Sequence, residues 1–130
     1  MGFLGGRRDG ATETTRVRGQ QAEDAALAYL REAGLAVVER NYRTPGRGGG
    51  EIDLIMRERD GTLVFVEVRS RTRADFGGAG ASIGTGKQRR IVFAARHYLL
   101  RCKPLPPCRF DVVLIEAAGV QWLRAAFDAG

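Results

Sequence analysis

The sequence has few of the residues that a zinc site needs. It contains one histidine, His97, and two cysteines, so no second cysteine pair or histidine cluster completes a set of zinc ligands. Cys102 and Cys108 flank a proline-rich segment. A local disulfide and two free thiols are both open, and a reducing cytoplasm favours the thiols. The sequence therefore predicts no zinc site.

Long apolar runs are also missing. No segment approaches the roughly 20 apolar residues that a membrane-spanning helix needs, and the N-terminus lacks the apolar core of a signal peptide. The opening Met-Gly does not continue into a myristoylation pattern, because Gly6 stands where serine or threonine is required. We therefore expect a cytoplasmic protein that does not enter a membrane.

Lysine is scarce, with only Lys87 and Lys103, yet the chain is strongly basic. Lysine and arginine together number 21 against 15 acidic residues, which gives a formal net charge of +6 and an isoelectric point near 10.1. This excess favours an anionic partner, with nucleic acid ahead of an acidic membrane surface. Because the chain has 130 residues and 44% of them are hydrophobic, we expect one globular domain with one core.

The N-terminal residues differ from the rest in composition. They are rich in glycine, arginine and threonine without an apolar repeat, so we predict a flexible basic arm over residues 1–18 and a single domain over residues 19–130. Apolar residues at helical spacing then predict a helix from Gly19 to Ala33, ended by Gly34. Glu23 lies at the border of its apolar stripe, where it can lean over the sheet that the helix covers.

A β-hairpin is predicted between residues 51 and 71. Two runs rich in Ile, Val, Leu and Phe flank an Asp-Gly turn, and matching their apolar faces fixes the register. This register leaves Arg59, Asp60 and Gly61 as the loop. The predicted pairs are Glu51 with Arg69, Ile52 with Val68, Asp53 with Glu67, Leu54 with Val66, Ile55 with Phe65, and Met56 with Val64.

The predicted register places two acids, Asp53 and Glu67, directly opposite each other. Opposed residues have Cβ atoms about 4.5–5.5 Å apart, and like charges at this distance destabilise a hairpin. Two hard carboxylates that converge in this way suit Mg²⁺ or Mn²⁺, with water completing the shell. The alternative is a Glu51–Arg69 cross-strand ion pair, with the two acids left at a solvated sheet edge. Both interpretations stay open on the pattern alone.

The other elements complete an α/β pattern. The sequence predicts a strand over Leu35–Arg43, a glycine-rich flexible link over Thr44–Gly50, a helix over Lys87–Arg101, a strand over Arg109–Glu116, and a short edge strand over Val120–Arg124. This α-β-β-β-α-β order predicts an α/β sandwich, in which helices flank a mixed sheet of four to five strands.

Basic residues gather after the hairpin and at the start of the second helix. Positive side chains in the first turn of a helix oppose its dipole unless an anion lies near, which favours phosphate at this position. The candidate nucleic-acid contacts are Arg71, Arg73, Lys87, Arg89 and Arg90.

Several segments resemble a known family. G-Q-Q-A-E-D-A-A-L-A-Y-L, R-N-Y-R, G-E-I-D-L-I, F-V-E-V-R-S-R, G-K-Q-R-R-I and R-F-D-V-V occur in this order. Over about Arg18 to Phe127 the chain is similar to the YraN-like bacterial family, and through it to the restriction-endonuclease-like PD-(D/E)XK nucleases, which include archaeal Holliday-junction resolvases. The resemblance implies a restriction-endonuclease-like sandwich.

The resemblance also implies a catalytic signature of an Asp, then Glu-x-Lys on the next strand, with a further Glu from the first helix. Carried over, Asp53 and Glu67 become catalytic residues and metal ligands, and Glu23 becomes the helical acid of the metal site. Arg69 stands where the family has its lysine. Because arginine does not give up a proton near neutral pH, Arg69 cannot act as a general base, and Lys87 is the candidate amine instead.

The leading hypothesis is a nuclease that uses Mg²⁺ or Mn²⁺ to hydrolyse phosphodiester bonds of DNA, with branched or damaged DNA as the expected substrate and Glu51 as a candidate accessory acid. The alternative is a catalytically weak or inactive DNA-binding module with the same fold. A structural ion-pair cluster ranks last. A homodimer is retained as an option because resolvase-like relatives act as dimers.

Overall fold

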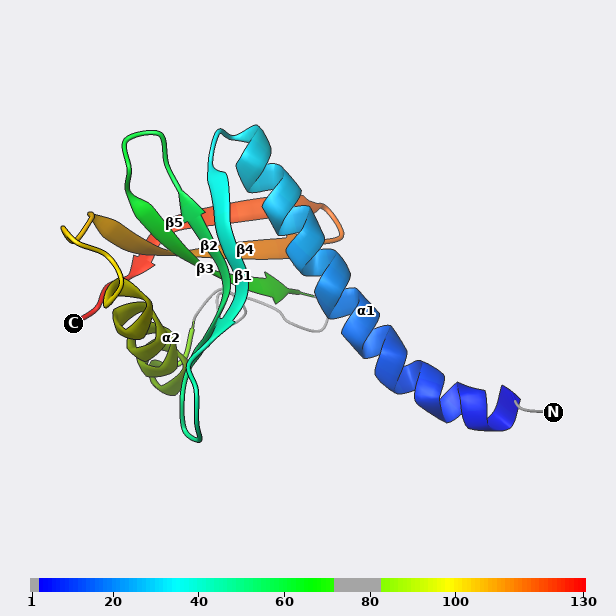
Figure 1. Ribbon diagram of the computed structural model, residues 1–130. Helices are drawn as coiled ribbons and strands as arrows, with labels where there is room; N and C mark the ends of the chain where they lie inside the picture. Colours follow the sequence, from blue (N-terminus) through cyan, green and yellow to red (C-terminus); the bar gives the residue numbers. More distant parts are fainter. Residues whose placement is uncertain (1–2, 72–82) are drawn as a thin grey trace.

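The computed structural model describes residues 3–71 and 83–130, with side chains described from residue 16 onward. Its elements, shown in Figure 1, are α1 (Phe3–Glu32), β1 (Ala36–Arg43), β2 (Glu51–Arg57), β3 (Leu63–Ser70), α2 (Thr85–Leu99), β4 (Cys108–Glu116) and β5 (Gly119–Phe127). The predicted α/β sandwich is confirmed, with a five-stranded mixed sheet and two helices in the described residues.

The sheet has the strand order β1-β2-β3-β4-β5. Neighbouring strands are antiparallel except β3 and β4, which run parallel. A parallel pair needs a long crossover connection, and the segment between β3 and β4 contains α2. Because α2 follows β3 in this crossover, its first residues lie near the C-terminal end of β3.

Each face of the sheet has its own apolar core. Val64 and Val66 of β3 pack with Ala26 and Leu30 of α1, whereas Phe65 belongs to the core that α2 covers. Alternate residues of a strand point to opposite faces, so α1 and α2 lie on opposite sides of the sheet (Figure 1). This two-sided burial explains why the central strands are almost continuously apolar.

The hairpin register is confirmed at its centre. Leu54 pairs with Val66, Ile55 with Phe65, and Met56 with Val64, as predicted. Gly61 has φ +95° and donates its N–H to the carbonyl oxygen of Glu58 at 3.0 Å, as the predicted bulged turn requires.

The ladder between β2 and β3 does not continue to the predicted pairs at the other end. It stops at Leu54, and Asp53 instead accepts a hydrogen bond from the Val68 backbone N–H through its side chain. Glu51 is the ladder partner of Arg43 on β1, and the two side chains form an ion pair at 3.2 Å. The predicted cross-strand pairs Glu51–Arg69, Ile52–Val68 and Asp53–Glu67 are thus wrong as ladder pairs, because a carboxylate has taken the place of a backbone acceptor.

Several predicted boundaries shift. The first helix begins at Phe3 rather than Gly19, and its N-terminal half projects beyond the sheet (Figure 1). The division into an arm and a domain stays a prediction. The last strand continues to Phe127 because a bulge, where Ala125 has φ +50°, lets it follow β4 past the predicted end at Arg124.

Two smaller features complete the fold. Cys102 and Cys108 are both free thiols, so the local disulfide is not formed. Among the helices of the described residues, α1 and α2, neither is long and apolar enough to cross a membrane.

Candidate functional site

The candidate site lies where β2 and β3 separate. Oδ2 of Asp53 on β2 accepts the Val68 N–H at 2.8 Å, which draws the Asp53 carboxylate toward β3. Glu67, the residue before Val68, is 8% exposed. From α2, Lys87 places its Nζ atom 3.5 Å from Oε2 of Glu67. Three elements therefore bring two acids and one amine together, and the proximity predicted for Asp53 and Glu67 arises without a ladder pair.

The electrostatics of the two acids are unfavourable in the absence of a bound cation. The pKa of Glu67 is raised to about 8, first by burial and second by repulsion from Asp53. The Lys87 ammonium acts in the opposite direction and lowers this pKa. The pKa of Asp53 is raised as well, chiefly by burial. The hydrogen bond from the Val68 N–H and the charge of Lys87 both lower it, but by less. The two acids therefore hold a proton between them near neutral pH and titrate as a pair.

Glu67 also lacks a hydrogen-bond partner on one side. Its Oε1 atom is buried and makes no hydrogen bond within residues 3–71 and 83–130. A buried carboxylate oxygen without a partner costs free energy. Two carboxylates with a spare oxygen form a hard donor set, which fits Mg²⁺ or Mn²⁺.

The protein groups alone do not form a complete metal cage. Among the described side chains, no three His, Cys, Asp or Glu residues are grouped closely enough to hold an ion together. Mg²⁺ commonly binds through one or two carboxylates and keeps several waters or substrate oxygens. Asp53 and Glu67 match this pattern, with the remaining positions left to water or to a phosphate.

Glu23 belongs to the surroundings of Asp53. The pKa of Glu23 is raised by burial first and by the charge of Asp53 second. Residues of β1 hold it: Arg40 lies 3.7 Å from its Oε1 atom, and the Asn41 amide, turned so that its nitrogen faces Glu23, donates to both oxygens at 3.2 Å. Asn41 has φ +52°, a left-handed conformation that asparagine tolerates. The assignment of Glu23 as a metal ligand stays a prediction.

The predicted cationic residues lie in different surroundings. Arg69 follows Glu67 by two positions on β3, so both lie on the face that α2 covers. Arg71 donates from Nε to Oε2 of Glu116 at 2.6 Å and is an ion-pair residue. Arg73 lies outside the described residues. Arg89 is exposed on α2.

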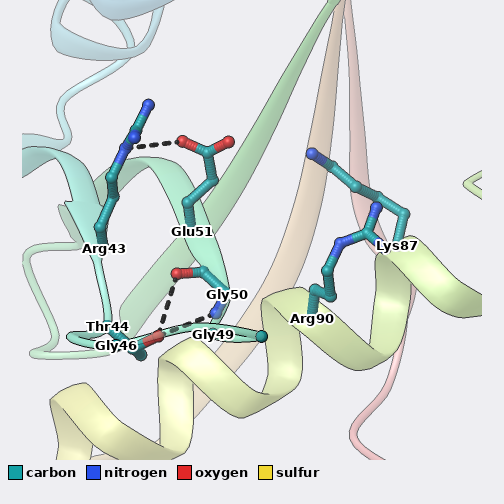
Figure 2. A pocket seen from close by; sticks show the side chains of 9 residues that line it. Arg43, Thr44, Gly46, Gly49, Gly50, Glu51, Lys87 and Arg90 are labelled. Atoms are coloured by element: carbon teal, nitrogen blue, oxygen red, sulfur yellow. Dashed lines mark hydrogen bonds and ion pairs between the residues drawn. The ribbon is translucent and has the colours of Figure 1, made fainter.

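A basic cavity of about 320 Å³ lies beside the acid pair, and Figure 2 shows it. One wall carries Arg43 and Glu51, which form an ion pair at 3.2 Å, and the other carries Lys87 and Arg90 of α2. Lys87 thus contacts Glu67 and also lines this cavity. The lining residues in the described part of the chain are Arg43, Thr44, Gly46, Gly48, Gly49, Gly50, Glu51, Lys87 and Arg90.

The floor of the basic cavity is the Thr44–Gly50 loop, which sequence analysis treated as a flexible link. The backbone N–H of Thr44 donates to the Gly50 carbonyl at 3.0 Å, and the Gly50 N–H donates to Oγ1 of Thr44 at 2.8 Å. A Cβ atom on Gly50 would lie 1.9 Å from the Arg90 carbonyl oxygen, so only glycine lets the loop pack against α2. The loop is closed by hydrogen bonds at its base.

The roles of Arg43 and of the cavity were not predicted from the sequence, because both depend on how the loop meets α2. The signals were present in part: a threonine and a run of glycines immediately precede the strand that carries Asp53. Asn41 was also missed as a residue that holds Glu23.

Comparison with known proteins gives a consistent family assignment. The description "Uncharacterised protein family UPF0102" belongs to the family model that matches residues 22–115. A UPF0102 protein of Acidovorax sp. (strain JS42) is 71% identical over 131 residues, covering 99% of both chains. A UPF0102 protein of Paracidovorax citrulli (strain AAC00-1) is 72% identical over 117 residues, covering 90% of this chain and 87% of the relative. The chain therefore belongs to the UPF0102 family.

Proposed function

We propose that this protein is a metal-dependent nuclease of the restriction-endonuclease-like type, which hydrolyses phosphodiester bonds of DNA. The observation that carries the proposal is the buried Asp53–Glu67 pair, whose two acids repel each other, with Lys87 at 3.5 Å from Glu67. A purely structural role gives no reason to bury two acids together and leave one oxygen without a partner among the described residues.

The acid pair supplies the ligands in this proposal. Asp53 and Glu67 would hold Mg²⁺ or Mn²⁺, with Glu23 tuning Asp53 from the α1 side. The bound ion would polarise the scissile phosphate and lower the pKa of a water molecule that attacks it. The Val68 N–H fixes the orientation of Asp53, so the ligand geometry is set before substrate arrives.

The cations supply charge for the phosphate. The Lys87 ammonium, already within reach of Glu67, would contact a phosphate held at the acid pair and offset the negative charge of the transition state. Arg69 can offer charge to the same face of the sheet but cannot accept a proton near neutral pH. Lys87 therefore takes the position of the amine that the family resemblance expects, from a helix rather than from β3.

Cleavage assays test the proposal. Linear, nicked and four-way-junction DNA are incubated with Mg²⁺, with Mn²⁺ or with EDTA. We expect metal-dependent cleavage that falls about a thousandfold or more in Asp53→Asn and in Glu67→Gln. The matched control is Glu32→Gln, an exposed acid at the end of α1, which should stay within about twofold of the wild type.

The outcome also decides between the enzyme and a DNA-binding module. Salt-sensitive binding without cleavage, unchanged by Asp53→Asn or Glu67→Gln, would overturn the nuclease proposal in favour of the module. A large rise of cleavage in Arg69→Lys would show that the arginine limits catalysis. Sedimentation of the protein with and without junction DNA tests whether it acts as a homodimer.

A further inference from the structure

The basic cavity between the Thr44–Gly50 loop and α2 is distinct from the acid pair. We propose that it is a phosphate subsite, which binds a backbone phosphate of the DNA strand next to the phosphate held at Asp53 and Glu67. The inference rests on the proposed function, because it takes the same substrate. The subsite would give the protein a second contact with the DNA backbone, beside the one at the acid pair.

The charges of the cavity walls favour a phosphate. Arg43, Lys87 and Arg90 contribute three cations, and Glu51 is the only acid among the lining residues that the structure describes. Arg43 pairs with Glu51 at 3.2 Å, and both side chains remain accessible, at 75% and 42% exposure. Arg90 makes no ion pair within the described parts of the chain. Lys87 is shared with Glu67, so Arg90 is the lining cation that remains fully available to a ligand.

The backbone of the floor leaves room for the ligand. Gly46 and Gly48 have φ +84° and +69°, conformations that side chains strain, and nothing lies within 4 Å of where their Cβ atoms would be. The first turn of α2, which contributes Lys87 to the cavity, contains no acidic residue. A phosphate in the cavity would meet positive charge from the side chains of Lys87 and Arg90.

Lys87 shows why a strand is favoured over a free anion. This residue contacts Glu67 and lines the cavity, so the two positions share one side chain. A DNA strand can place one phosphate at the acid pair and another in the cavity at the same time. Once the first phosphate is bound, the second contact forms within the same complex and strengthens binding. A single phosphate ion gains only one of them.

Binding measurements test the subsite separately from cleavage. Fluorescent duplex and junction DNA are titrated with protein in EDTA, and with Mn²⁺ in an Asp53→Asn background. We expect Arg90→Gln to weaken binding about tenfold at low salt and to lower the slope of log K against log salt by about 1. The control is Arg96→Gln, which removes the same charge from an exposed position of the same helix outside the cavity and should leave both values unchanged.

A single neutral methylphosphonate placed at successive positions of the strand locates the contact. At one position the wild type should lose about tenfold in affinity, whereas Arg90→Gln should lose less than about twofold there, because the two changes remove the same contact. Removal of a 5′-terminal phosphate provides the second arm. If only that removal weakens binding, the cavity takes a strand end, and the proposed internal position is wrong.

The results separate the two proposals. Equal effects of Arg90→Gln and Arg96→Gln in a protein that cleaves DNA would overturn the subsite and leave the nuclease. A specific effect of Arg90→Gln in a protein that cleaves nothing would support the subsite and overturn the nuclease. Absence of binding to every DNA at low salt would overturn both.

Discussion

Two buried acids in the same sheet have opposite surroundings. Asp111 on β4 is 0% exposed, and its carboxylate accepts hydrogen bonds from Nε of Arg109 at 3.0 Å, from Nε1 of Trp122 at 2.9 Å and from the backbone N–H of Ala125 at 2.9 Å. Glu67 on the neighbouring strand is 8% exposed, and one of its oxygens has no partner in the described residues. Asp111 thus accepts hydrogen bonds from three donors, whereas Glu67 has one oxygen without a donor among the described residues.

The difference indicates what each acid does. Asp111 ties the bulge between β4 and β5 to Arg109, which also bonds Glu58 near the hairpin turn, so its charge stabilises the fold. Glu67 sits beside a second acid that raises its pKa, so its charge costs stability. Groups that weaken a fold without evident compensation are expected at functional sites, where a ligand supplies the missing interaction.

Neutral isosteres at the two acids should differ in their effect on stability, and this is the largest effect on stability that we expect. Asp111→Asn removes the charge that Arg109 and Trp122 depend on, so we expect the free energy of unfolding to fall by about 3 kcal/mol. Glu67→Gln should leave it unchanged or raise it near pH 8. Urea unfolding of both variants measures this. A loss in Glu67→Gln as large as in Asp111→Asn would show that both acids are structural.

The pH dependence of stability sharpens the same comparison. In the metal-free protein the pKa of Glu67 is raised from 4.5 to about 8, so the folded state binds more protons than the unfolded state between these values. The free energy of unfolding must therefore fall as pH rises through this window, because each pKa unit of the shift corresponds to about 1.4 kcal/mol. Urea titrations from about pH 5 to about pH 8 should show this fall in the wild type and a much flatter profile in Glu67→Gln. Identical profiles would contradict the assigned shift.

Metal binding should reverse that loss. At a concentration about 100 times its Kd, an ion that binds only the folded state adds about 2.7 kcal/mol of stability. We expect Mn²⁺ to raise the free energy of unfolding of the wild type near pH 8 and to have little effect on Glu67→Gln or Asp53→Asn. Glu32→Gln should respond as the wild type does. An equal gain in all four proteins would place the ion elsewhere.

The sequence predicted the part of the site that depends on local pattern. Alternating apolar residues and an Asp-Gly turn define the centre of the hairpin, and this brings Asp53 and Glu67 close together. The end of the ladder was not predictable, because it depends on a side chain replacing a backbone acceptor at Val68. The order of apolar and polar residues does not show where a side-chain oxygen will replace a backbone carbonyl as the hydrogen-bond acceptor.

Contacts that depend on how α2 packs on the sheet could not be predicted from the sequence either. Lys87 reaches Glu67 only because α2 crosses back over the sheet, and Gly50 is required only because α2 lies against it. In the sequence, Asp111 is an acid among apolar residues of the predicted strand Arg109–Glu116. It is fully buried, because both faces of β4 are covered and its donors come from distant residues.

The smallest effect concerns Glu51, which lines the basic cavity and acts on the charge of Asp53. Its charge helps to raise the pKa of Asp53, and its ion pair neutralises Arg43. If Glu51 acts as an electrostatic wall, Glu51→Gln should tighten DNA binding about two- to fivefold, because one exposed ion pair is worth about 1 kcal/mol or less. Asp24→Asn, which removes an acid paired with Arg40, is the matched control and should not tighten binding. A fall of cleavage in Glu51→Gln without tighter binding would instead assign Glu51 as an accessory acid of the metal site.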